Sequence, residues 1–351
     1  MAKILNGSHV FDANTFISSA DATSIMFLSP GSINIAGVTS VIGSTSADTV
    51  NLTVPSSFVP VGFTLDTFSA FNFDLKNTSS STTDSLNGTS ANDTVIFSNS
   101  GIADMVNVRY AGNGGTDLLD LTAANDKLYL KTAFTGTIDS NGGSDSITGS
   151  SGVDSITLGE DSAQANWFYS AGGTAATDTL IGTSFADNIT LTAPSKINYT
   201  SGGGADLIKG SSGADVITFT SSTAVSVTGG TGADLITLPT AVGVSDSVIF
   251  NSRTDSLTLA AGDVITNFQS GTSSTSVDVL TFNSTLQLGV FDYVGTGLMF
   301  TGGDNSEARA MQSGANTVIE LDLNADTLVD MSITLLGVNS STIDIGDFSF
   351  A

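Results

Sequence analysis

The sequence predicts an all-β fold, a right-handed parallel β-solenoid capped by N- and C-terminal β segments. A short unit recurs along the chain: a glycine-containing turn, an aspartate and a short apolar strand, as in GSSGADVITF and GGTGADLITL. Such self-similarity is typical of stacked coils. Hydrophobic residues make up 40% of the chain, which also has 38 glycines. This apolar content is too high for a disordered linker, so we expect a folded chain.

Aspartates mark the repeat at two levels. Five complete pairs stand nine residues apart: Asp84/Asp93, Asp117/Asp126, Asp145/Asp154, Asp178/Asp187 and Asp206/Asp215. Asp234 begins a sixth pair, but Gly243 stands at its second position. The pairs begin at steps of 28 or 33 residues, so a spacer strand follows each pair. We therefore expect a coil with three sides: two strands after the aspartate turns and a third from the spacer.

Each unit has an internal polarity. The aspartate is expected to turn outward at a corner, while the apolar residue two positions later points into the core. Strand geometry, in which alternate residues share a face, supports the inward position of Ile147, Ile156 and Ile236. The glycines permit positive φ and bring carbonyls together at the corner. The glycines of interest are Gly142, Gly143, Gly203, Gly230 and Gly232.

The charge of the chain points to a divalent cation. There are 34 acidic against 9 basic residues, a formal net charge of −25. Such a chain should repel nucleic acid and anionic membranes. Oxygen-rich ligands without cysteine favour several Ca²⁺ ions, held by the paired aspartates, Asp234 and the corner glycines. A metal-free β-helix whose Asp and Gly only form tight turns stays open. Stacked like charges argue against it.

A second candidate calcium site lies near the C-terminus. Asp322, Asn324, Asp326 and Asp330 alternate as in an EF-hand loop. The glycine expected at position six is Thr327, and the glutamate expected at position twelve is Ile333. A solvated acidic turn is the alternative interpretation.

These motifs resemble a known family. Gly229 to Ile236, GGTGADLI, resembles in full the RTX (haemolysin-type) calcium-binding repeat. The resemblance implies calcium between neighbouring turns, held by Asp carboxylates and loop carbonyls. The frame Gly262-Asp263-x-Ile265-x-x-Phe268 resembles the closing segment of such proteins, and Asp347-Phe348-Ser349-Phe350 resembles their type I secretion signal. The resemblance also implies export by the type I secretion machinery to the outside of a bacterial cell. The N-terminus lacks the features of a cleavable signal peptide, which agrees with this expectation.

No catalytic motif is apparent. The only histidine is His9, so neither H-E-x-x-H nor a serine triad with a second histidine can form. Trp167 is the one tryptophan, which disfavours a sugar-cleaving cleft. No apolar run is long enough to span a membrane. We expect a protein that is not an enzyme and does not insert into membranes.

Three regions are expected. They are an N-terminal β cap or assembly region at 1–80, an RTX-like solenoid at 81–245 with a degenerate coil from about 40, and a C-terminal secretion region at 246–351. A scaffold without catalytic machinery favours an S-layer-like subunit that binds copies of itself in a sheet or filament; a cell-surface polysaccharide is a candidate partner. The alternative is a calcium-dependent adhesin or a surface-, ice- or glycan-binding solenoid. Sustained Thr-x-Thr rows would favour that alternative, but such patterns are only scattered, as at Thr190 and Thr192.

Overall fold

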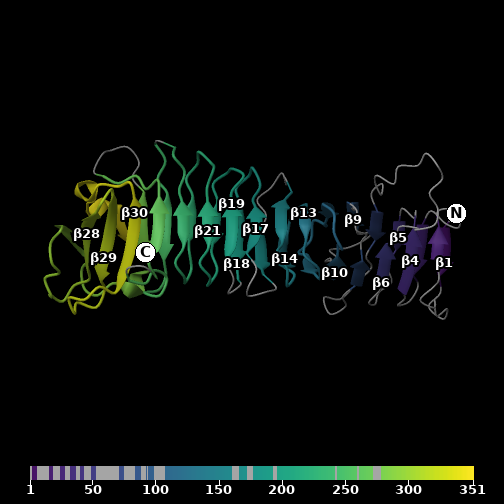
Figure 1. Cartoon of the computed structure of the whole chain (residues 1–351), viewed down its shortest axis with the longest axis horizontal. Coiled ribbons are helices and arrows are strands. Elements are labelled where there is room, and N and C mark those ends of the chain that lie inside the picture. The colour runs from purple at the N-terminus through teal and green to yellow at the C-terminus, as the bar shows by residue number, and fades with distance from the viewer. Residues whose placement is uncertain are drawn as a thin grey trace. The chain divides into compact units, whose positions relative to one another are not determined.

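The structure is a computed structural model. It describes 107–159, 166–171, 177–192, 196–241, 243–258, 261–271 and 278–351, together with short strand segments and Asn92 among the first 106 residues. The chain forms two compact units, 1–179 and 180–351. Both are built from stacked parallel strands (Figure 1), and the expected parallel β-solenoid is confirmed. No helix in the described residues is long and apolar enough to cross a membrane.

Unit 1 consists of two parallel sheets. The first sheet contains β1 (Ala2–Leu5), β3 (Ser24–Phe27), β5 (Ser40–Ile42), β7 (Phe71–Asp74), β9 (Thr94–Ser98), β11 (Asp117–Asp120), β13 (Thr135–Asp139) and β15 (Ser155–Leu158). The second contains β2 (Phe16–Ser18), β4 (Ser32–Ala36), β6 (Thr49–Leu52), β8 (Asp84–Asn87), β10 (Asn107–Ala111), β12 (Lys127–Leu130), β14 (Ser144–Thr148) and β16 (Asn166–Ser170). The boundary between the units falls inside β17 (Asp178–Ile181).

Unit 2 has two sheets of the same kind. One contains β19 (Ile197–Thr200), β21 (Val216–Thr218), β23 (Leu235–Thr237) and β25 (Asp263–Thr266), followed by β30 (Met331–Leu336), β29 (Asn316–Asp322), β28 (Glu307–Ser313) and β27 (Asp292–Thr296). The other contains β18 (Asn188–Leu191), β20 (Leu207–Lys209), β22 (Ser226–Thr228), β24 (Ser247–Phe250), β26 (Val279–Phe282) and β31 (Phe348–Phe350). The described residues of unit 2 also form 3₁₀ turns at Ser284–Leu286, Ser340–Thr342 and Ile345–Asp347.

The end of unit 2 departs from the solenoid pattern. β30 pairs in parallel with β25, but β29 pairs antiparallel with both β28 and β30. Successive antiparallel strands need only short connections, so this segment can close a stack of coils in few residues. Phe250, Phe282 and Phe350 stack in series on the opposite sheet, with centroids 5.3 Å apart at each step.

The coil has two sides, so the expectation of three was wrong. Successive strands alternate between the two sheets, and equivalent residues of neighbouring coils are typically 19 positions apart, as are Asp126 and Asp145. A half-coil is thus about as long as the nine-residue spacing within a pair. The 28-residue repeat does contain three strands. Because each strand is one half-coil, three strands make one and a half turns of the solenoid and not one three-sided coil.

This explains the spacer strands. At the corner position of each spacer an apolar residue replaces the aspartate: Phe134, Trp167, Ile197 or Val225. Each aligns with an aspartate of the adjacent coil.

The inward positions of the apolar residues are confirmed. Ile147, Ile156 and Ile236 are at most 1% exposed, and the strands alternate buried and partly exposed residues. The core is therefore a pair of facing ladders in which each coil covers the apolar residue of the next.

Candidate functional site

The aspartates point into the solenoid, not outward as expected. Every described member of the pairs, from Asp117 to Asp215, and Asp234 as well, is at most 4% exposed. The physical reason is the strand period itself: Asp and the apolar residue two positions later share a face. Asp84 begins β8, and nothing is described of its side chain; Asp93 lies outside the described residues.

One oxygen of each carboxylate links neighbouring coils. The backbone N–H of Asp126 donates to Asp145 Oδ1 at 2.8 Å, that of Asp154 to Asp178 Oδ1 at 2.9 Å, and that of Asp187 to Asp206 Oδ1 at 3.0 Å. Asp215 donates in the same way to Asp234 at 2.8 Å. The aspartates therefore form short rows, which the apolar residues of the spacer strands interrupt, and each carboxylate satisfies a buried amide of the coil beside it.

The rows extend beyond the pairs found in the sequence. Asp234 donates to Asp263 Oδ1, and Asp246 to Asp278 Oδ1, both at 2.9 Å. These aspartates do not fit the nine-residue spacing because longer insertions separate their coils. The usable signal was the D-x-[VIL] strand start, which Asp263 and Asp278 retain.

The second carboxylate oxygen is supported locally in four of the described turns. A serine or threonine four residues before the aspartate donates its backbone N–H to Oδ2, and its hydroxyl also bonds the carboxylate. Ser150 serves Asp154 in this way, with 2.7 Å from N to Oδ2 and 2.9 Å from Oγ to Oδ1. The other members of this class are Thr122 with Asp126, Thr183 with Asp187, and Ser211 with Asp215.

Tyrosine hydroxyls support other carboxylates from inside the core. Tyr110 donates to Asp117 and Tyr169 to Asp178, both at 2.9 Å. Burial, and then the nearby aspartates, raise the pKa of Tyr169 well above its usual range, so its hydroxyl keeps the proton it donates. Asp154 Oδ2 lies 3.4 Å from the same hydroxyl, so one tyrosine serves two coils.

Three aspartates of unit 2 lack such support. Within the described part of the chain, Oδ2 of Asp206, Asp234 and Asp263 is buried and has no hydrogen-bond partner. Burial, more than neighbouring carboxylates, raises the pKa of these groups to about 6, 7 and 8, respectively. Asp255 adds to the pKa rise of both Asp234 and Asp263. Asp234 and Asp263 are the row positions where the buried negative charge is least compensated, while a side-chain hydrogen bond from Ser201 lowers the pKa of Asp206.

Glycines make room for the carboxylates. A Cβ added at Gly229 would lie 2.3 Å from Asp234 Oδ2, and one at Gly182 would lie 2.4 Å from Asp187 Oδ2. Gly112 and Gly149 stand in the same relation to Asp117 and Asp154. At these four turns the glycine five residues before the aspartate leaves room for the carboxylate that folds back over it, whereas Leu121 and Ser140 stand at that position before Asp126 and Asp145.

The corner glycines selected from the sequence have the expected backbone. Gly142, Gly143, Gly203, Gly230 and Gly232 all have positive φ, between 89° and 156°. A Cβ at Gly230 would lie 1.8 Å from the Ser211 carbonyl oxygen, and one at Gly232 would lie 2.4 Å from that of Gly213. These corners therefore bring carbonyl oxygens of adjacent coils close to the turn.

The rows do not form ready-made acidic cages. Among the described residues, no group of three or more Asp, Glu or His side chains is placed to hold a metal ion. A cation here would use carboxylates of two adjacent coils together with carbonyl oxygens. The unpartnered oxygens of Asp234 and Asp263 fit that chemistry, whereas carboxylates whose two oxygens both accept N–H or O–H donors fit it less well.

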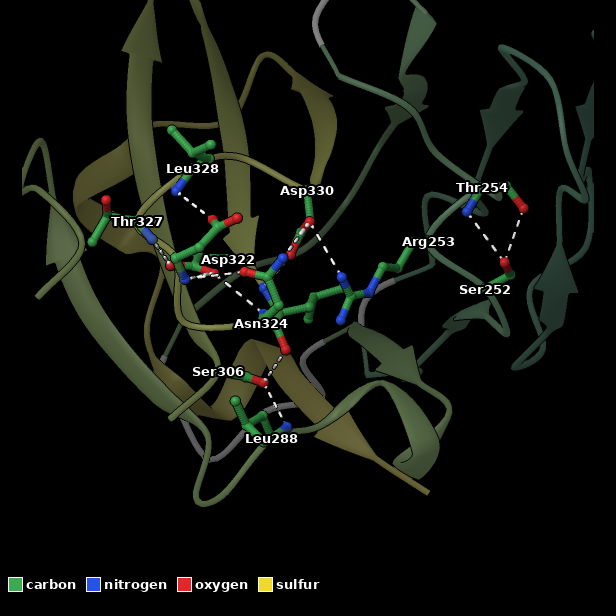
Figure 2. A network of polar contacts seen from close by, with 12 residues as sticks. Ser252, Arg253, Thr254, Leu288, Ser306, Asp322, Asn324, Thr327, Leu328 and Asp330 are labelled. Atoms are coloured by element: carbon green, nitrogen blue, oxygen red, sulfur yellow. Dashed lines mark hydrogen bonds and ion pairs between the residues drawn. The ribbon is translucent and has the colours of Figure 1, made fainter. Parts of the chain in front are cut away.

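The C-terminal loop gathers its predicted ligands in one turn (Figure 2), but both oxygens of Asp322 and of Asp330 already have hydrogen-bond or ion-pair partners. Asp322 accepts backbone N–H groups from Asn324, Asp326 and Thr327, and Asp330 accepts the N–H of Leu323 at 2.7 Å. Arg253 forms an ion pair with Asp330 at 3.4 Å. Thr327 has φ of 67°, the left-handed conformation for which a glycine is expected at position six. The four predicted ligand residues are thus brought into one turn.

Other residues of interest lie elsewhere. Trp167 is buried at 1% exposure, so it offers no open stacking surface. His9 lies outside the described residues. The chain matches no protein-family model and no curated protein, so the RTX resemblance of its repeats is carried by the residues alone.

Proposed function

We propose that the chain is a secreted, calcium-dependent, non-enzymatic structural protein of the RTX type, which assembles with copies of itself into an S-layer-like sheet or filament outside a bacterial cell. The observation that carries the calcium dependence is the set of buried, unpartnered Oδ2 atoms of Asp206, Asp234 and Asp263. Buried carboxylates without a compensating charge are costly. A divalent cation bound along the rows would remove that cost.

Two further observations support calcium over other cations. Neighbouring strands in a sheet lie about 4.8 Å apart, roughly twice a calcium–oxygen distance, so an ion between two coils can reach an oxygen of each. The turn at 322–330 supplies a second set of oxygens in one loop. Mg²⁺ demands a tighter octahedron and fits such adaptable sets poorly.

Calcium binding would then be linked to folding. An ion that binds only the folded chain adds its binding free energy to stability. In a calcium-poor cytosol the chain would stay unfolded and suited to export through a type I system, and it would fold on reaching calcium outside. Self-assembly would follow folding, because the interacting faces exist only in the stacked coils.

Circular dichroism with chelator and added calcium tests this proposal. We expect the chelated protein to lose its β signal at neutral pH, to regain it with millimolar Ca²⁺, and to respond much less to Mg²⁺. Light scattering and negative-stain microscopy should then show ordered assemblies only with calcium. A chelated protein that keeps its β signal at neutral pH, or a calcium-loaded protein that stays monomeric, would contradict the proposal.

A further inference from the structure

The outer face of β19, β21, β23 and β25 in unit 2 is regular and carries no ionisable side chain. Four threonines stand in register on adjacent parallel strands: Thr200, Thr218, Thr237 and Thr266. Beside them runs a second row with Asn198, Val216, Leu235 and Val264 in register. All eight side chains are partly or largely exposed, and Leu235 is 37% exposed. This "threonine face" was missed in the sequence because its threonines align across coils instead of along one strand.

Unit 1 provides an internal contrast. On its corresponding sheet, the outer residues Asp120 and Asp139 pair in register. Both are partly exposed, so like charges stand side by side there. In unit 2 the two rows carry no ionisable side chain on β19, β21, β23 or β25, and Thr334 and Leu336 of β30 continue them. On a chain of net charge −25, a neutral face of this size is a place where two copies can approach without repulsion.

We infer that the threonine face is a contact surface between copies of this chain, packed sheet against sheet. This deepens the proposed self-assembly and rests on it. We favour a second copy of the chain as the partner because both rows repeat at the distance between neighbouring strands. The same face of a second copy repeats at the same distance, so the two faces can stay in register along the whole stack. Methyl-bearing side chains at that spacing can interdigitate into a dry interface between sheets about 10 Å apart.

The size of the face sets the strength of the contact. Five strands of three to four residues cover roughly 20 Å by 10 Å. That is well below the approximately 800 Å² per partner of a stable interface. A single contact is therefore weak, and it becomes lasting only when many copies bind together in an array. We therefore expect an extended assembly that forms above a threshold protein concentration, and not a discrete dimer.

The test introduces charge on this face and on a matched one. The variant Thr218→Glu/Thr237→Glu places two like charges on adjacent rungs, as Asp120 and Asp139 do in unit 1. The control Ser226→Glu/Ser247→Glu adds the same charge to adjacent rungs of the opposite sheet, at partly exposed positions. Both are purified in millimolar calcium, checked for β signal by circular dichroism, and followed by sedimentation velocity over a concentration series.

We expect the threonine-face variant to need at least about tenfold more protein to associate, while the control associates like the unmodified protein. If the double variant fails to fold, Leu235→Ser, which removes the most exposed apolar group of the face, should show the same direction. Unchanged association of a folded variant, or equal loss in the control, would overturn the inference and leave self-assembly standing. A protein that never associates, or a face whose variants lose only ice or glycan binding, overturns it as well.

Discussion

At the scale of single residues, the aspartates of the rows differ in how their second oxygen is treated. Asp187 accepts donors from Thr183 at both oxygens, whereas Asp206, on the adjacent coil, has a buried Oδ2 without a partner. Ionised carboxylates are stabilised by N–H donors and destabilised by burial without them. Identical residues at equivalent corners should therefore respond in opposite ways to the same substitution.

The substitutions Asp187→Asn and Asp206→Asn measure this difference. In chelator, under conditions where the fold persists, Asp187→Asn should lower the free energy of unfolding by about 1–3 kcal/mol, because an amide NH₂ meets the donors of Thr183. At the highest pH at which the chelated protein stays folded, Asp206→Asn should raise it, because it removes an uncompensated buried charge, and it should weaken the response to calcium. Denaturant unfolding of both variants checks this; equal destabilisation by the two would contradict it.

Thr327 offers a second residue-level test. It is a β-branched residue at φ of 67°, which costs about 1–2 kcal/mol relative to its usual conformations. Thr327→Gly removes this strain but adds backbone entropy to the unfolded chain, so a net gain of about 0.5–1 kcal/mol is expected. If the loop binds calcium, calorimetry should also show tighter binding in the variant. Loss of stability in this variant would show that the methyl packing near Gly302 outweighs the strain.

At the scale of the turn and strand, the unit is a glycine, a carboxylate five residues later, and an apolar residue two positions beyond that. Where the glycine is present, as at Gly229, the carboxylate occupies the space of a side chain, and the apolar residue is fixed by the core. The sequence revealed this order because all three positions are local. The serine or threonine four residues before the aspartate was equally local, but its role depends on the carboxylate facing inward.

Gly229→Ala tests the steric part. The new methyl would lie 2.3 Å from Asp234 Oδ2, so the carboxylate must move and lose its bond to Asp215 N–H. We expect a loss of about 2–4 kcal/mol in thermal or denaturant unfolding. Gly303→Ala is the control, since its nearest neighbour atom would lie 3.7 Å away and its φ is ordinary. A neutral Gly229→Ala would mean that the row tolerates displacement of the carboxylate.

At the scale of the whole molecule, stability should depend jointly on protons and calcium. Burial raises the pKa of Asp206, Asp234 and Asp263 to between about 6 and 8, above the unfolded value near 4. A group whose pKa is raised by folding contributes stability that is complete below its unfolded pKa and lost as pH rises through the folded one.

Without calcium, the unfolding temperature should therefore fall by at least about 5 °C as pH rises from 5 toward neutral, where the fold is lost. With saturating calcium this slope should become shallower, because the ion compensates the same carboxylates. Differential scanning calorimetry over this pH range, with and without chelator, is the measurement. A flat profile in chelator would show that the row carboxyls are compensated in some other way.

The sequence by itself determined the solenoid, the positions of its corners and the inward apolar ladder, because period, glycine and aspartate act over a few residues. The same period of two implies that the aspartates face inward with the apolar residues. The large negative charge of the chain instead suggested that the aspartates face solvent. Only the stacked structure shows buried amides of the next coil, and hydroxyls such as that of Tyr169, that accommodate the carboxylates. The two-sided coil and the threonine face were likewise decided by register between coils, since neighbours 19 residues apart meet only after the chain has folded.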